Sequence, residues 1–157
     1  YPSRQGETVL TGITDIDQDG FPELLLTDTQ WEFYQGVCHA CSPHVGHYLT
    51  WDPVKERYKE DPLRFRGEYE KDIQETLAAL EEKNYPEYYL GNAVSVFLNY
   101  QMIGESRRGW VEFEWLLSRI PAERELIKSI QNDLHTRLEG NLPSGIPGTH
   151  DLIHRDK

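Results

Sequence analysis

The first third of the chain alternates apolar and polar positions over short runs, which is the pattern of half-buried strands. Residues 9–14 are mostly β-branched or apolar and stop at an acidic segment. The leucines after Pro22 indicate a strand that is buried on both faces or covered by later helices. A turn around Pro53 separates two further runs. The pattern predicts an antiparallel meander of four or five strands, at residues 9–14, 22–27, 31–34, 47–52 and 57–60.

After about Asp61 the apolar positions recur every three or four residues, which is the period of an amphipathic helix. The segment Asn84-Tyr85-Pro86 and the residues Gly104, Pro121 and Gly140 interrupt this pattern. The sequence therefore predicts three or four helices, at residues 68–83, 90–101, 110–120 and 126–138.

Strands followed by helices, instead of an alternation of the two, are typical of the α+β class. A few short strands cannot bury a face alone, so we expect the helices to pack on the sheet. The expected organisation is a β-meander over 1–62, a helical segment over 63–140 that shares its core, and a flexible tail over 141–157 rich in Gly and Pro.

The net charge of -11 in 157 residues disfavours nucleic acid and anionic membranes as partners, because binding to phosphate needs a basic surface. No apolar run approaches the roughly 20 residues of a membrane span, so no transmembrane segment is expected. The chain begins at Tyr1, which leads us to expect that a leader has been removed.

The most specific motif lies between the first two expected strands. Asp15, Asp17 and Asp19 stand at alternate positions, Gly20 permits a sharp turn, and Glu23 provides a fourth carboxylate. Alternate side chains of a turn converge on one point, and calcium takes six to eight oxygen ligands. We expect calcium to bind here, with the carbonyl of Phe21 as a further ligand. The alternative is an acidic turn that binds nothing tightly, since Asp and Gly are also ordinary turn residues.

The loop is not an EF-hand, since its twelfth position is Leu26 where an EF-hand needs Glu, and no helices flank it. The segment from Ile13 to Leu26 resembles the FG-GAP or VCBS-type repeat, and residues 48–58 are similar to the outer hairpin of such a unit. The resemblance covers about residues 9–60 and implies a calcium loop between two strands of a blade, with the ligands named above, in an exported or cell-surface protein. Two departures are a single unit instead of an array, and Glu instead of the commoner Asp at the last ligand.

A second candidate site combines Cys38, Cys41, His44 and His47, which follow one another at intervals of three. Thiolate and imidazole are zinc ligands, so four of them would suit a structural zinc site. The alternatives are a disulfide between Cys38 and Cys41, two plain thiols, or a redox pair. A redox pair of the thioredoxin type would need a βαβ pattern, which the sequence lacks.

These patterns together favour an exported, calcium-stabilised structural or binding module, located in the periplasm, at the cell surface or in the medium. A site of low charge density fills where calcium is millimolar, which is outside the cytosol. The alternative classes are a hydrolase or other enzyme whose site is built from loops, and a zinc or redox protein centred on residues 38–47. The sequence has no phosphate loop, nucleophile elbow or His-Glu-x-x-His helix, so no catalytic residue is expected.

Overall fold

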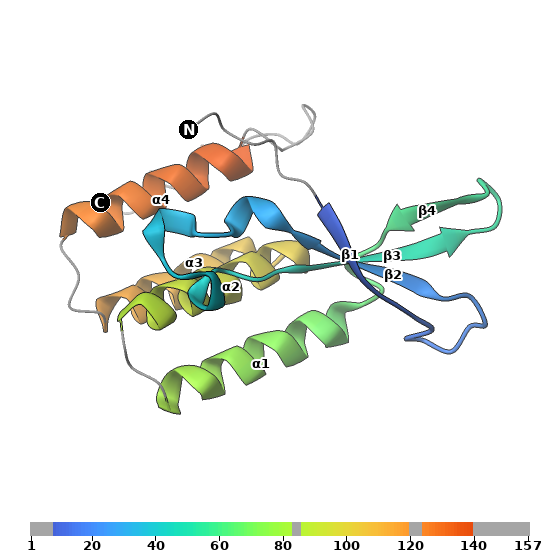
Figure 1. Cartoon of the computed structure of the whole chain (residues 1–157), viewed down its shortest axis with the longest axis horizontal. Coiled ribbons are helices and arrows are strands. Elements are labelled where there is room, and N and C mark those ends of the chain that lie inside the picture. The colour runs from blue at the N-terminus through green and yellow to red at the C-terminus, as the bar shows by residue number, and fades with distance from the viewer. Residues whose placement is uncertain (1–7, 83–85, 120–123, 140–157) are drawn as a thin grey trace, which may run out of the picture. The chain divides into compact units, whose positions relative to one another are not determined.

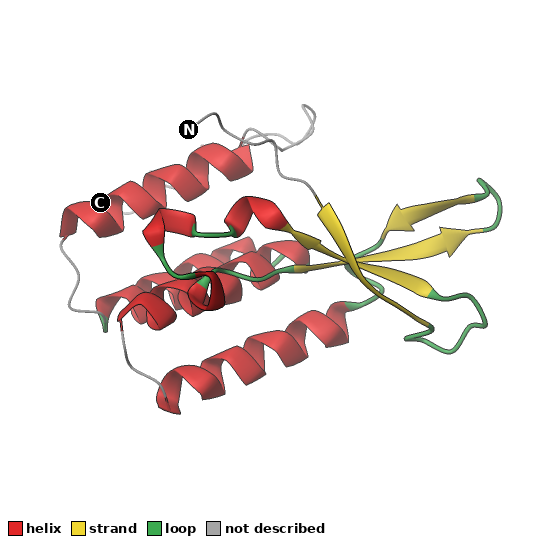
Figure 2. Ribbon diagram, in the orientation of Figure 1, coloured by secondary structure: helices red, strands yellow, loops and turns green. Residues whose placement is uncertain are grey.

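A computed structural model describes residues 8–82, 86–119 and 124–139 (Figure 1). The chain divides into a unit of residues 1–121 and a second unit of residues 122–157, and each is described by itself. Strands come first and helices follow, as Figure 2 shows, which confirms the predicted α+β class.

The strands of the described residues form one antiparallel sheet in the order β1-β2-β3-β4, which is a meander as predicted. Their bounds are β1 Thr8–Thr14, β2 Glu23–Asp28, β3 Gly46–Asp52 and β4 Arg57–Glu60. The register between β1 and β2 shifts between Leu10 and Gly12, so Thr11 forms a bulge in the edge strand. The acidic motif connects β1 to β2 directly.

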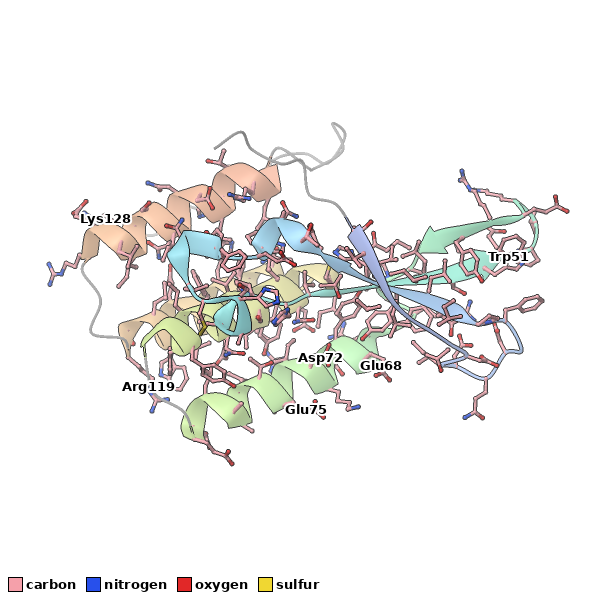
Figure 3. All side chains as sticks on the ribbon, in the orientation of Figure 1. Trp51, Glu68, Asp72, Glu75, Arg119 and Lys128 are labelled. Carbon is pink, nitrogen blue, oxygen red and sulfur yellow. A yellow bond between two sulfur atoms is a disulfide. The ribbon has the colours of Figure 1, made fainter. Side chains whose placement is uncertain are left out.

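The two faces of the sheet differ in how they are covered. Tyr48, Thr50 and Glu23 share one face by register and alternation, and all three side chains are buried. The other face is apolar but open, since Ile13 is 61% exposed and Leu10 is 50% exposed. We call this second face the outer face; its apolar residues are Leu10, Ile13, Leu24, Leu26, Leu49, Trp51 and Tyr58. Trp51 lies toward the end of the sheet that is farther from the helices (Figure 3).

The prediction of a strand at residues 31–34 is wrong. The segment forms short 3-10 turns instead, η1 Thr29–Trp31 and η2 Tyr34–Gly36, followed by η3 His39–Cys41. The side chain of Asp28 accepts a hydrogen bond from Gln30 N–H and starts the first turn, and Phe33 has a φ of 55°, which no strand allows. Trp31 and Tyr34 are buried in this connection, whereas Phe33 is exposed. The apolar content of the segment thus reflects burial, although the segment is not a strand.

The predicted helices are all present, with small changes at their ends. They are α1 Arg66–Glu82, α2 Pro86–Met102 and α3 Ser106–Ser118 in the first unit, and α4 Arg124–Glu139 in the second. The tail predicted over 141–157 lies outside the described residues.

The core of the first unit surrounds α2, which contacts α1, α3 and the η3 turn. From Tyr89 to Tyr100 nearly every residue of α2 is buried, including the polar side chains of Ser95 and Asn99. Ser95 accepts a hydrogen bond from His44 N–H at 2.8 Å, and Asn99 donates one to the carbonyl of Ser95. A helix buried on all sides needs partners for such polar groups, and local backbone groups supply part of them.

The helices meet the sheet around Tyr48, whose ring contacts Phe65 and Tyr69 at centroid distances of 5.5 and 5.1 Å. The hydroxyl of Tyr69 also donates to the carbonyl of Gly46. The rest of the sheet extends away from the helices (Figure 1). The helices therefore pack on the sheet through the first half of β3 instead of covering a whole face.

Two glycines allow backbones to approach α2 closely. A Cβ added at Gly91 would lie 1.6 Å from the carbonyl oxygen of Cys41, and one at Gly109 would lie 2.8 Å from Cβ of Tyr100. The first clash is with backbone, which cannot move aside as a side chain can.

We expect Gly91→Ala to lower the free energy of unfolding by about 3 kcal/mol or more, because the added methyl group overlaps the η3 backbone. Chemical denaturation followed by circular dichroism measures this loss. Gly67→Ala is the matched control, since a Cβ at this position of α1 meets nothing within 4 Å. This control should be neutral or gain roughly 0.5–1 kcal/mol from helix propensity. Equal stability of the two variants would contradict the close approach.

Candidate metal centre

The three alternate aspartates converge in the connection between β1 and β2. Asp15, Asp17 and Asp19 each offer a carboxylate oxygen, and these oxygens lie within 4.8 Å of one another. All three residues are exposed. Three carboxylates at this spacing repel one another unless positive charge or hydrogen-bond donors compensate them.

Backbone N–H groups of the same loop supply part of that compensation. Asp15 accepts hydrogen bonds from Asp19 N–H and Gly20 N–H, both at 3.1 Å. Asp19 accepts one from Phe21 N–H at 2.8 Å. Gly20 has a φ of 91°, which favours glycine and turns the chain so that these N–H groups point inward. The loop thus holds its carboxylates in place by local bonds.

Glu23 lies at the base of this loop as the first residue of β2 and is 0% exposed. Its Oε2 accepts a hydrogen bond from Ile16 N–H at 2.7 Å, which ties the start of β2 to the start of the loop. Its Oε1 is buried and has no hydrogen-bond partner among the described residues. A buried carboxylate oxygen without a partner is costly, and a bound cation is one way to satisfy it.

The guanidinium of Arg64 contacts two of the aspartates. Its Nε donates to Asp17 at 2.5 Å and its terminal nitrogen donates to Asp19 at 2.5 Å. The Phe21 N–H, and then Arg64, hold the pKa of Asp19 below its usual range. Arg64 comes from the turn between β4 and α1, so the loop is tied to a segment far away in sequence.

The structure therefore brings together three of the residues predicted to bind calcium and places the others nearby. Asp15, Asp17 and Asp19 form the cluster, whereas Glu23 follows at the end of the same connection and accepts a hydrogen bond from Ile16 N–H. Phe21 directly follows the turn and is held to the loop by its N–H. The three clustered carboxylates are hard oxygen ligands of the kind that calcium prefers, and Glu23 has a buried carboxylate oxygen without a partner at the end of the same connection.

The second candidate site has a different arrangement. Cys38 and Cys41 form a disulfide across the η3 turn, which leaves no thiolate to bind zinc. The side chain of His44 is exposed, and His47 lies on β3, where its Nδ1 contacts Glu60 at 2.5 Å. Within the described part of the chain these four residues do not gather as metal ligands. The disulfide that the sequence offered as an alternative is the arrangement found.

Sequence reasoning missed Arg64 and a row of acidic residues on α1. Glu68, Asp72 and Glu75 lie along that helix (Figure 3). Burial raises the pKa of Asp72, and its two acidic neighbours raise it further. The helical spacing of this row is visible in the sequence, but its partial burial is not. The role of Arg64 has no local signal, because its partners are more than forty residues away.

Comparisons with protein-family models, curated proteins and solved structures returned no match to this chain. Within the described residues, no helix combines the length and apolar character of a membrane span.

The disulfide predicts that a thiol assay in denaturant without reductant finds no reactive thiol. Replacing both Cys38 and Cys41 with Ser should lower the free energy of unfolding by about 2 kcal/mol, since a loop this short restricts the unfolded chain modestly. Reductant should lower the free energy of unfolding of the unmodified protein by a similar amount and leave that of the serine variant unchanged. Two reactive thiols, or about one zinc per chain in elemental analysis, would instead favour thiols or a zinc site.

The contact between His47 and Glu60 predicts a pH dependence of stability. The Glu60 carboxylate raises the pKa of His47 above its ordinary value, and Asp28 adds to this effect. The resulting stabilisation is complete below the unfolded pKa of about 6.5 and is lost as the pH rises through the folded pKa. We expect the free energy of unfolding to fall over this window, and Glu60→Gln to flatten the fall. An unchanged slope in that variant would contradict the assignment.

Proposed function

We propose that the chain is a calcium-binding structural or binding module, in which the ion holds the connection between β1 and β2. The observation that carries the proposal is the convergence of Asp15, Asp17 and Asp19, in a connection that ends at Glu23, a fully buried carboxylate with one unpaired oxygen. Exposed acidic groups alone are common, and the buried Glu23 is what separates this loop from an ordinary acidic turn.

The chemistry of the donors favours calcium over a transition metal. The loop offers hard oxygen ligands and no nitrogen or sulfur, which is the preference of calcium or magnesium. Calcium accepts a flexible and irregular shell, whereas magnesium demands a compact octahedron. An exposed loop with backbone-bonded carboxylates suits the more permissive ion. Asp15, Asp17, Asp19 and Glu23 would hold it, together with the Phe21 carbonyl and water.

The role proposed for the ion is to fix the β1–β2 hairpin. β1 is an edge strand with a bulge, and most of its residues are exposed, so little packing holds it in register. A cation bound by both ends of the connection would oppose separation of the two strands. The chemistry is therefore structural, and no reaction is assigned to the site.

The compartment proposed is extracytoplasmic, in the periplasm, at the cell surface or outside the cell. The Cys38–Cys41 disulfide supports this, since disulfides persist in oxidising environments. Calcium sites with few rigid ligands also fill at the millimolar calcium of such environments. The resemblance of residues 9–60 to the FG-GAP or VCBS-type repeat is part of the same proposal.

The test is thermal unfolding after treatment with EDTA, with and without added calcium. At a calcium concentration of about 100 times Kd, binding should add about 2.7 kcal/mol to the free energy of unfolding, which is a shift in Tm of several degrees. Asp17→Asn should abolish most of this shift.

Glu114→Gln is the matched control, because it removes one negative charge from an exposed position of α3. It should keep the full calcium response. A calcium response that survives Asp17→Asn, or no response in the unmodified protein, would show that the loop does not bind the ion. Magnesium at the same concentration should give a smaller shift.

A further inference from the structure

We propose that Arg64 is a tethered counter-cation that calcium must displace from the acidic loop, so that residue 64 sets the calcium affinity without being a ligand. The inference rests on the proposed function and adds a competitor within the same chain. Its basis is that the guanidinium contacts the same carboxylates that the ion would need.

The contacts of Arg64 are more specific than those of an average surface ion pair. One planar guanidinium reaches two neighbouring aspartates of the loop, with a bond at 2.5 Å to each. The side chains of Arg64, Asp17 and Asp19 are 33%, 29% and 36% exposed, so each is partly withdrawn from water. A guanidinium that bridges two carboxylates has the planar geometry in which arginine binds best.

The backbone of Arg64 is also held in place. Its N–H donates to the carbonyl and to the side chain of Asp61, which fixes the turn between β4 and α1. The neighbouring Phe65 is buried and contacts Tyr48, so the turn is anchored on both sides. Arg64 therefore reaches the loop from a fixed base instead of meeting it by chance.

The pairing excludes simultaneous binding of calcium in the same place. Calcium needs inward-facing oxygens of Asp17 and Asp19, and the guanidinium donates to an oxygen of each. A positive guanidinium beside a divalent cation is also repelled by it. In the described chain, the ion pairs of these two carboxylates all come from Arg64. The negative charge of the loop can be neutralised either by Arg64 or by the calcium ion.

The turn that carries Arg64 is followed directly by a second set of ion pairs. Two residues later, Arg66 pairs with Glu70 on α1 and with Glu105 at the start of α3. The turn that carries Arg64 is thus continuous with the contacts between two helices. Calcium binding should release Arg64 into solvent while Arg66 keeps its partners.

The experiment is isothermal titration of calcium into four metal-free proteins, namely the unmodified chain and its variants Arg64→Gln, Arg64→Lys and Arg57→Gln. Arg57 is exposed on β4, so its variant removes the same unit of charge without touching the loop. We expect Arg64→Gln to lower the Kd roughly three- to tenfold beyond Arg57→Gln, the scale of one partly exposed ion pair and one repulsion. Arg64→Lys should stay closer to the unmodified chain because it keeps the charge.

An Arg64→Gln chain that binds calcium no more tightly than Arg57→Gln would overturn the inference and leave the proposed function standing. Absence of calcium binding in all four proteins would overturn both. Binding in Arg64→Gln alone would support the inference in its strongest form, with the arginine as the dominant competitor.

A second measurement uses the unmodified protein and does not depend on how a variant folds. The Nε–H of Arg64 is hydrogen-bonded to Asp17 and should give a distinct, slowly exchanging nitrogen–proton resonance in metal-free protein. Calcium should move this resonance to the position of a solvent-exposed arginine, and EDTA should restore it. A resonance that calcium leaves unchanged while it binds would overturn the displacement.

Discussion

The close approach of two backbones at Gly91 governs how the first unit is built. The η3 turn lies directly on α2, with the carbonyl of Cys41 where a side chain would otherwise stand. The disulfide holds this turn in shape, and the bond between His44 N–H and Ser95 fastens it to the next turn of the helix. Gly109 of α3 lets that helix approach another part of α2 in a similar way. The burial of α2 therefore depends on the two glycines as much as on its apolar residues.

This arrangement explains why the sheet extends beyond the core. The connection between β2 and β3 contributes buried residues of its own, such as Trp31 and Tyr34, so burial does not depend on the sheet alone. β3 links the two regions, since its start contacts α1 through Tyr48 and its end lies near the hairpin to β4. The β1–β2 connection is ordered by hydrogen bonds within the loop and by its contacts with Arg64.

Much of the fold was readable because its signals are local. Short β-branched, apolar or alternating runs located the four strands, the period of three to four residues located the helices, and the spacing of Asp15, Asp17 and Asp19 predicted their convergence. The segment from Trp31 to Tyr34 failed because apolar content was taken for a strand, although Asp28 and the positive φ of Phe33 dictate turns. The partners of Arg64 and the close fit at Gly91 depend on tertiary contacts, which no local pattern encodes.

The position of Arg64 has a consequence for the concentration range in which the proposed calcium site would respond. Arg64 follows β4 by four residues, because that strand ends at Glu60, so it stays near the loop even when it is released. Tethering over a short span gives an effective concentration in the millimolar range, which does not change with dilution of the protein. If the loop binds calcium as proposed, a free ion has to compete with this constant internal supply of positive charge. The proposed site would then ignore traces of calcium and respond near the millimolar level, with the short span between β4 and Arg64 setting the threshold.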